Sequence, residues 1–356
     1  MEEPQPLKNG RDTILDFWRG ISILLVLVHH FTWFRFHHIF YGTAHERTLE
    51  WIPIIGSRLG GLGVKIFFVI SGYIITKMLI EEEATHGRIN ARLFYIRRFL
   101  RILPAYCVYL LFIFISGHIG WLSVTDVRVP CVAFLANIPI GMECGWNFGH
   151  LWSLSIEEQF YLFWPAFLLL TTPFIRPNYV KILILSLIAL SFSGFFMYDW
   201  IDNGISFAHI IVGALYAISP VFRKIIREWR LQCVAVLTIM TIAIPALTDI
   251  RSHAHYFQIL RAFFPLGALC VISLTYDIKK LTSSRFFSAI AKIGMASYSI
   301  YLWQQPFTDL SNRYGAYSPF AVPLLLIPCA GLSYILIEKP VNAWARRRFI
   351  RNTAHA

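Results

Sequence analysis

Long apolar runs, separated by short polar or basic connections, constrain this chain more than any other feature of its sequence. A helix that crosses a bilayer needs about 20 mostly apolar residues, and such runs recur along most of the 356 residues. Hydrophobic residues make up 56% of the chain and charged residues 15%, far from the composition of soluble domains. We therefore predict an all-α, polytopic helical membrane protein.

The apolar runs predict about ten transmembrane helices. Their ranges are 14–34, 61–80, 102–120, 150–172, 180–198, 204–220, 231–247, 256–275, 286–307 and 318–338. A further apolar run, 125–142, is short and contains two prolines. We expect it to be interfacial or re-entrant, because a crossing there would move the strongly basic later connections to the outside.

Lysine and arginine gather in alternate connections, which favours a cytoplasmic position for those connections. With the N-terminus inside, the basic segments 81–101, 221–230 and 276–285 are all cytoplasmic, and so is the C-terminus. We predict one membrane domain over 1–356 with a core of 10–345 and no appended soluble domain. The net charge of +12 follows from this topology, and we expect membrane lipid rather than nucleic acid as a partner.

The cysteines do not predict a metal site. The chain has six of them, with no CxxC pair and no Cys/His cluster at metal-ligand spacing. Only Cys131 and Cys144 are candidates for a disulfide.

Ionisable residues inside the predicted spans are costly in lipid and point to function. The first run carries Arg19 near its cytoplasmic end and His29 and His30 near the other end. At 1.5 Å per residue, Arg19 and His30 lie about 16 Å apart along the helix. A histidine is well suited to take a proton from a hydroxyl near neutral pH. The alternative is that Arg19 reaches to the interface and the histidines pack structurally.

Two adjacent acids, Glu157 and Glu158, lie about two turns inside the run that begins at 150. One should face the bundle and the other point about 100° away. We place them at the depth of His30, where a carboxylate could orient the imidazole as it does in hydrolase triads. The alternative is a glutamate neutralised by a structural arginine.

A basic cluster and a small-residue pair complete the polar exceptions. Arg97, Arg98 and Arg101 lead into the third run, and Arg98 and Arg101 share a helix face. Paired guanidinium groups bind phosphate, so a phosphorylated ligand could dock there, although positive-inside anchoring is the better explanation when the cluster is taken alone. Ser71 and Gly72 lie mid-span, where small residues permit close helix packing or a slot for a ligand chain.

These segments resemble, in order, the motifs of the membrane acyltransferase family known as acyltransferase 3. The matching motifs are LDFWRGISILLVLVHHF, FFVISGYIIT, FYIRRFLRILPAY, WSLSIEEQFYLFWP, SYSIYLWQQP and IEKP. The family's spacing of an arginine, ten residues and a histidine selects Arg19 and His30. Many relatives have an acidic residue where this chain has Lys65, and a histidine where it has Gln304.

The resemblance implies a multi-pass enzyme of a cell membrane, most simply the bacterial inner membrane. It would move an acyl group, usually acetyl, from cytoplasmic acyl-CoA to a hydroxyl of an extracytoplasmic or lipid-linked carbohydrate such as O-antigen or exopolysaccharide, without a metal. A macrolide or another secondary metabolite is the alternative acceptor. By position, the implied catalytic residues are His30, Glu157 and Glu158, and the implied donor-binding residues are Arg19, Ser71, Arg97, Arg98 and Arg101.

The sequence leaves the reaction route open. His30 either deprotonates the acceptor hydroxyl for direct attack or carries the acyl group itself. A different class of function is a proton-coupled carrier, in which the buried histidine and glutamates form a relay. The oligomeric state does not follow from these patterns.

Overall fold

The structure is a computed structural model of the whole chain, and it describes residues 12–40, 51–122, 124, 129–138, 144–171, 201–247, 254–278, 282–314 and 321–349. Within these ranges every regular element is helical and no strand occurs. The all-α prediction is therefore confirmed for the described part of the chain.

The described residues form a succession of helices along the chain. Their bounds are α1 Thr13–Phe40, α3 Trp51–His86, α4 Ala91–His118, α5 Val129–Val132, α6 Trp146–Gly149, α7 Leu151–Thr171, α9 Ile201–Ile218, α10 Pro220–Leu247, α11 Ala254–Thr275, α13 Arg285–Met295, α14 Ser297–Tyr314, α15 Ala321–Leu332, the π-helix η4 Ser333–Glu338 and α16 Lys339–Phe349.

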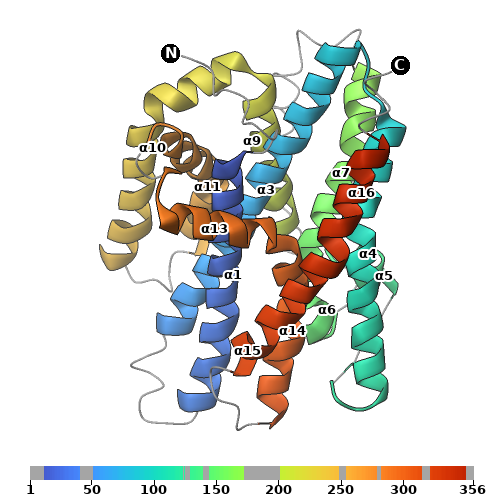
Figure 1. Cartoon of the computed structure of the whole chain (residues 1–356). Helices are drawn as coiled ribbons and strands as arrows, with labels where there is room; N and C mark the ends of the chain where they lie inside the picture. The colour runs from blue at the N-terminus through green and yellow to red at the C-terminus, as the bar shows by residue number, and fades with distance from the viewer. Residues whose placement is uncertain are drawn as a thin grey trace.

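The helices form two packed groups that meet at α14 and α7. In one group, α1 lies along α3, α3 along α9, and α10 against α11, while α13 crosses α1 (Figure 1). In the other, α14 packs against α15, and η4 and α16 continue α15 beside α4. Contacts of α1 with α14 and of α3 with α7 join the two groups.

Polar residues begin several helices as caps, because the first backbone N–H groups of a helix lack intrahelical partners. Asp12 accepts from the backbone N–H of Ile14 at 2.9 Å, and Asn90 accepts from that of Leu93 at 3.0 Å. Asp12 also accepts a hydrogen bond from the hydroxyl of Tyr276. Burial and the Asp12 carboxylate raise the pKa of Tyr276, so its phenol stays protonated and ties the start of α1 to the end of α11.

Glycines allow the closest helix contacts. A Cβ added at Gly72 would lie 1.9 Å from the carbonyl oxygen of Ile210, and one at Gly213 would lie 2.1 Å from that of Val69. At the crossing of α13 and α1, a Cβ at Gly294 would lie 1.7 Å from the carbonyl oxygen of Asp16. Only a residue without a side chain fits at these backbone contacts.

Several helices have the length and composition of membrane spans. In the described ranges, four qualify: Thr13–His30, Leu59–His86, Ala91–His118 and Leu324–Phe349. A pair bent by 106°, Ser206–Ile218 with Pro220–Val236, brings the total to five if it counts as one span. A helical membrane protein is thus confirmed, whereas the count of about ten and the side of the termini stay predictions.

The structure changes some predicted boundaries. The run 286–307 forms two helices and not one. The helix α13 ends at Met295, Ala296 leaves the helical conformation, and α14 begins at Ser297. The described part of 125–142 forms the one-turn helix α5 and turns, and whether this run crosses the membrane stays a prediction. The predicted span 180–198 lies outside the described residues.

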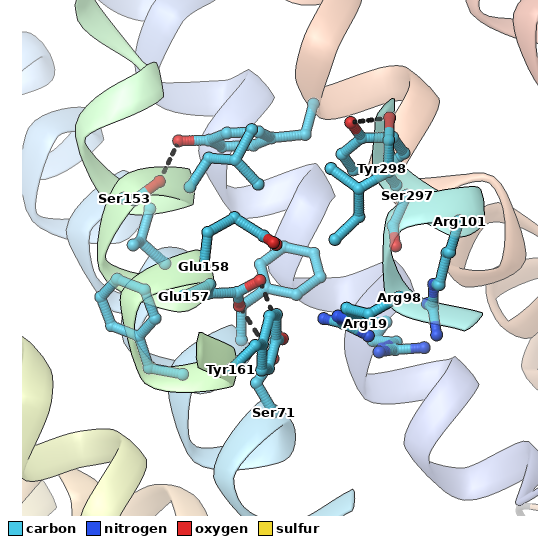
Figure 2. Close-up of a pocket in the computed structure, with 16 residues that line it drawn as sticks. Arg19, Ser71, Arg98, Arg101, Ser153, Glu157, Glu158, Tyr161, Ser297 and Tyr298 are labelled. Atoms are coloured by element: carbon cyan, nitrogen blue, oxygen red, sulfur yellow. Dashed lines mark hydrogen bonds between the residues drawn. The ribbon is translucent and has the colours of Figure 1, made fainter. Parts of the chain in front are cut away.

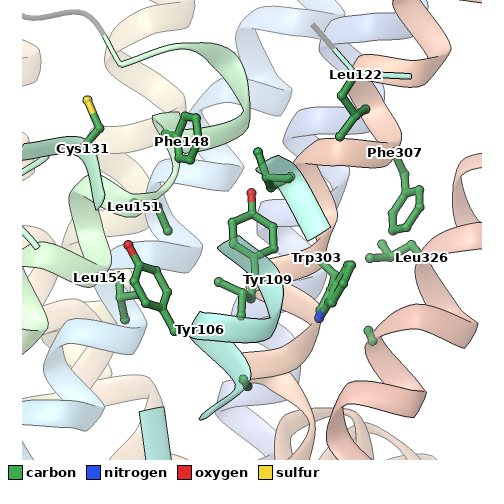
Figure 3. Close-up of a cluster of buried hydrophobic side chains, with 14 residues drawn as sticks. Tyr106, Tyr109, Leu122, Cys131, Phe148, Leu151, Leu154, Trp303, Phe307 and Leu326 are labelled. Atoms are coloured by element: carbon green, nitrogen blue, oxygen red, sulfur yellow. The ribbon is translucent and has the colours of Figure 1, made fainter. Parts of the chain in front are cut away.

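An apolar core fills the space between α4, α6, α7, α14 and α15 (Figure 3). Its fully buried members include Tyr109, Phe148 and Leu151. At its edge, Cys131 and Cys144 form a disulfide, which confirms the one cysteine pair that the sequence allowed. This bridge fastens α5 to the segment that leads into α6 and α7.

Large apolar side chains are exposed along the outside of the bundle. Leu111 and Ile115 of α4 are 60% and 52% exposed, and Leu324 and Ile327 of α15 are 68% and 70% exposed. Rows of this kind suit a lipid-facing surface, since contiguous apolar patches are uncommon on soluble monomers.

Candidate functional site

A polar pocket opens between the two helix groups, where α1, α3, α4, α7 and α14 meet. The space that atoms leave empty in and around it, open solvent included, is about 650 Å³. Its polar lining consists of Arg19, Ser71, Arg98, Arg101, Ser153, Glu157, Glu158, Tyr161, Ser297, Tyr298 and Tyr301 (Figure 2). Six of the eight site residues predicted from the sequence therefore line one cavity.

The arginines of the pocket lie together on one side. Figure 2 shows Arg19 of α1 next to Arg98 and Arg101 of α4. Arg98 and Arg101 project from one face of α4 because they are three residues apart. The Arg98 guanidinium stacks on the Tyr161 ring, 3.4 Å from its centroid. Like charges placed this close are unfavourable unless an anion joins them.

The glutamates come from α7 and have different environments. Glu157 accepts hydrogen bonds from Ser71 at 2.8 Å and from Tyr161 at 3.1 Å. Glu158 lies within electrostatic range of Arg98 and Arg101. Both glutamates thus line the pocket, and the expectation that only one of them would face the bundle is wrong.

Two charged groups of the pocket are buried without a complete set of partners. Nε of Arg98 and Oε1 of Glu158 are shielded from solvent, and neither has a hydrogen-bond partner among the described residues. A buried polar atom without a partner costs about 1–3 kcal/mol. Such atoms beside a cavity indicate a ligand that supplies the missing hydrogen bonds.

His30 lies toward the other end of α1. Its Nδ1 is 3.1 Å from the carbonyl oxygen of Val26. Because a carbonyl oxygen only accepts hydrogen bonds, Nδ1 carries the proton and the lone pair lies on Nε2. The His30 ring contacts Trp146 edge to face, with 5.9 Å between the ring centroids.

Glu157 lies at the level of Arg19 along the bundle and not at the level of His30. This differs from the equal depth of Glu157 and His30 that the sequence predicts. A Cβ at Gly60 of α3 would contact His29, and one at Gly63 would contact Val26, so α3 runs antiparallel to α1. Ser71, which binds Glu157, lies 11 residues beyond Gly60. At 1.5 Å per residue this is about 16 Å along the helix, which is the level of Arg19.

Arg97 is separated from the other site residues. It does not line the pocket, and its guanidinium lies 3.6 Å from the carboxylate of Glu82 on α3. The cause is helix geometry, since Arg97 lies about 100° around α4 from Arg98. His30 also lies outside the pocket lining, and it has no hydrogen bond to either glutamate among the described interactions.

Sequence reasoning missed the aromatic and histidine residues that connect the pocket to His30. Tyr301 lines the pocket and donates to the carbonyl oxygen of His150 at 2.8 Å. His150 in turn lies within electrostatic range of His30. Tyr301 sits in the motif SYSIYLWQQP and His150 lies two residues before WSLSIEEQFYLFWP, but a tyrosine or a histidine at a membrane interface has no distinctive spacing.

The described residues contain no cluster of three or more His, Cys, Asp or Glu side chains that could hold a metal ion. The chemistry available in this region consists of cations for an anionic ligand, carboxylates, tyrosine hydroxyls and a neutral imidazole. This set suits acyl transfer, in which an anionic donor is bound and a hydroxyl loses a proton.

The chain is similar to known proteins over most of its length. The family described as "Acyltransferase domain", the acyltransferase 3 family, matches residues 12–338. The peptidoglycan O-acetyltransferase OatA of Listeria monocytogenes serovar 1/2a is 28% identical over 83% of this chain and 54% of its own length. A Bacillus subtilis strain 168 protein, provisionally named the peptidoglycan O-acetyltransferase YrhL, is 26% identical over 82% of this chain and 52% of its own length.

The chain spans about half the length of the curated relatives it matches. No solved structure matches it. Because the family match covers nearly the whole described bundle, the chain belongs to the acyltransferase 3 family of membrane acyltransferases.

Proposed function

We propose that this protein transfers an acyl group, most simply acetyl, from cytoplasmic acyl-CoA to a hydroxyl of an extracytoplasmic carbohydrate. The observation that carries the proposal is the arrangement along α1. Arg19 lines a pocket with two further arginines, and His30 lies about 16 Å farther along the same helix. A donor with phosphate groups at one end and a thioester at the other fits this arrangement, with the phosphates at the arginines and the thioester near His30.

The donor side rests on the group formed by Arg19, Arg98 and Arg101. Guanidinium groups bind phosphate through paired, charge-assisted hydrogen bonds. The group lies within electrostatic range of Glu158 and Glu338, and the unpartnered Nε of Arg98 leaves a donor for a ligand. In the proposed orientation this pocket opens toward the cytoplasm, where acyl-CoA is found.

The reaction centre rests on His30. Its Nε2 has the lone pair needed to take a proton from an acceptor hydroxyl, since Nδ1 is bound to the Val26 carbonyl. The hydroxyl oxygen then forms the new ester bond to the acyl carbon as the thioester C–S bond breaks. The proton on His30 passes to the leaving thiolate, which restores the neutral imidazole and releases CoA as the thiol.

The acceptor side rests on a disulfide and on the relatives. Disulfides persist outside the reducing cytoplasm, and Cys131 and Cys144 belong to the segment that precedes His150 and Trp146, close to His30. This supports an extracytoplasmic position for the His30 end of α1. OatA of Listeria monocytogenes carries peptidoglycan in its name, which makes a cell-wall glycan the first acceptor to test.

The test uses the full chain, purified in detergent, with radiolabelled acetyl-CoA and soluble peptidoglycan fragments. We expect label in the glycan for the wild type and at least a hundredfold less for His30→Ala, given the contribution of a general base. His86→Ala is the matched control, because His86 also contacts the carbonyl four residues earlier but is exposed on α3.

Two results would contradict the proposal. One is transfer by His30→Ala at the wild-type rate. The other is an intact thioester with every acceptor and with the wild-type chain, which is the behaviour expected of a carrier.

A further inference from the structure

His150 is a second buried histidine near His30, and the mechanism above does not use it. It occupies the turn between α6 and α7 and is 3% exposed. Its ring lies between two tyrosines, with centroid distances of 5.7 Å to Tyr109 and 5.4 Å to Tyr301. The apolar core of Figure 3, which includes Tyr109, packs behind it.

The side chain of Gln305 determines which nitrogen of His150 carries the proton. Its Oε1 lies 2.8 Å from Nδ1 of His150 and 3.3 Å from the backbone nitrogen of the same residue. The backbone N–H donates to this oxygen, so the atom at Oε1 is the acceptor end of the carboxamide. Nδ1 of His150 is therefore the protonated nitrogen, and Nε2 carries the lone pair.

Nε2 of His150 makes no hydrogen bond of good geometry to the described residues, although the ring also lies near the backbone of Leu302. It is shielded from solvent and has no hydrogen-bond partner among the described residues. The carboxamide of Gln304 is also buried, and it lies within hydrogen-bonding range of the His30 ring. A buried polar atom without a partner costs stability, so Nε2 of His150 indicates a polar ligand at this place.

The His150 site is connected to His30 by direct contacts. Trp146 meets the His30 ring edge to face at 5.9 Å and donates from its indole nitrogen to the backbone carbonyl of Gln305 at 3.3 Å. His150 lies within electrostatic range of His30. The two imidazoles, each protonated on Nδ1, thus border the same buried polar region.

We propose that Nε2 of His150 accepts a hydrogen bond from a second hydroxyl of the acceptor, while His30 takes the proton of the hydroxyl that is acylated. Gln305 is a positioning residue, which holds His150 in the required tautomer. This inference rests on the proposed function and narrows the acceptor to a polyol or sugar with at least two hydroxyls within reach of the two histidines.

The experiment measures acceptor KM, kcat and acetyl-CoA binding for three variants of the full chain. His150→Phe keeps the ring volume and removes both nitrogens, and we expect its acceptor KM to rise by about tenfold or more. Gln305→Met keeps the length but loses the acceptor oxygen, and we expect a several-fold rise. Gln305→Glu keeps the oxygen and should stay within about twofold of wild type. Acetyl-CoA binding should not change in any of them.

Several outcomes would overturn the inference. An unchanged acceptor KM in His150→Phe would show that His150 does not contact the acceptor. Equal effects of Gln305→Met and Gln305→Glu would show that Gln305 does not position His150. His86→Phe, at an exposed site, should match wild type. If His150→Phe does not elute as a single species, the comparison of the two Gln305 variants decides. A wild-type chain that transfers nothing refutes the proposed function instead.

Discussion

The crossing of α3 and α9 predicts opposite effects for two glycine-to-alanine substitutions in the same helix. At Gly72, the new Cβ would lie 1.9 Å from the carbonyl oxygen and 2.8 Å from the carbonyl carbon of Ile210. At Gly61, a new Cβ would meet nothing within 4 Å. Both changes add one methyl group and the same increase in helix propensity, so the difference between them isolates the helix contact.

The magnitude follows from these distances. Ordinary contacts begin at 3.4 Å, so the oxygen at 1.9 Å is 1.5 Å too close. Both contacting atoms of Ile210 belong to backbone and cannot rotate away, so α3 and α9 have to separate. Overpacking costs about 1–3 kcal/mol, and more where backbone has to move, so we expect a loss of about 3 kcal/mol for Gly72→Ala. Gly61→Ala should be neutral or stabilising by up to about 1 kcal/mol.

The assay is unfolding in mixed micelles with increasing denaturing detergent, followed by circular dichroism. Because Gly72 adjoins Ser71, which holds Glu157, transfer activity should fall with stability in Gly72→Ala and persist in Gly61→Ala. Equal stability of the two variants would refute the packing reasoning, and so would a stabilised Gly72→Ala.

Three further predictions concern the pocket and the disulfide. Arg98→Lys keeps the charge but loses the fork that stacks on Tyr161, and acetyl-CoA affinity measured by calorimetry should fall about tenfold. Glu157→Gln has one acceptor oxygen for the two hydroxyl donors that bind Glu157, and it should unfold about 1 kcal/mol more easily. Replacing Cys131 and Cys144 together by serine removes a disulfide that joins residues 13 positions apart. The free energy of unfolding, measured by the same assay, should fall by about 3 kcal/mol.

Two of these predictions have a control within the chain. Arg92→Lys changes an exposed arginine of α4 and should bind acetyl-CoA like wild type. Cys107→Ser changes a free, exposed cysteine and should not alter stability. A control that behaves like its partner variant would show that the effect comes from general disturbance rather than from the contact.

The sequence predicted which residues line one pocket better than it predicted how deep in the bundle they lie. Arg98 and Arg101 were expected on one helix face because that depends only on spacing within a helix, and both line the pocket. The depth of Glu157 was wrong because it depends on the register of α3 against α1. That register comes from the fit of Gly60 and Gly63 against α1, which one sequence does not reveal.

The sequence also did not predict where helices break or which neutral polar residues form buried contacts. The helix α13 ends at Met295, one residue after the close contact of Gly294 with the backbone of Asp16, which is a tertiary contact that one sequence does not reveal. His150 was not singled out because a histidine at the start of an apolar run has no distinctive pattern. Its hydrogen bond to Gln305 joins residues 155 positions apart.

Arg19 and His30 lie on one continuous helix, so α1 fixes the distance between them. No hinge lies between them, so the distance from the arginine group of the pocket to the imidazole is set by eleven residues of helical rise. In the proposed function, a donor anchored at the arginines has to match that fixed length, and a longer or shorter arm would present its reactive carbon above or below His30. Inserting or deleting one residue between the two positions would also rotate them by about 100° relative to each other. Spacing in this helix is therefore under a constraint of length and of angle at once.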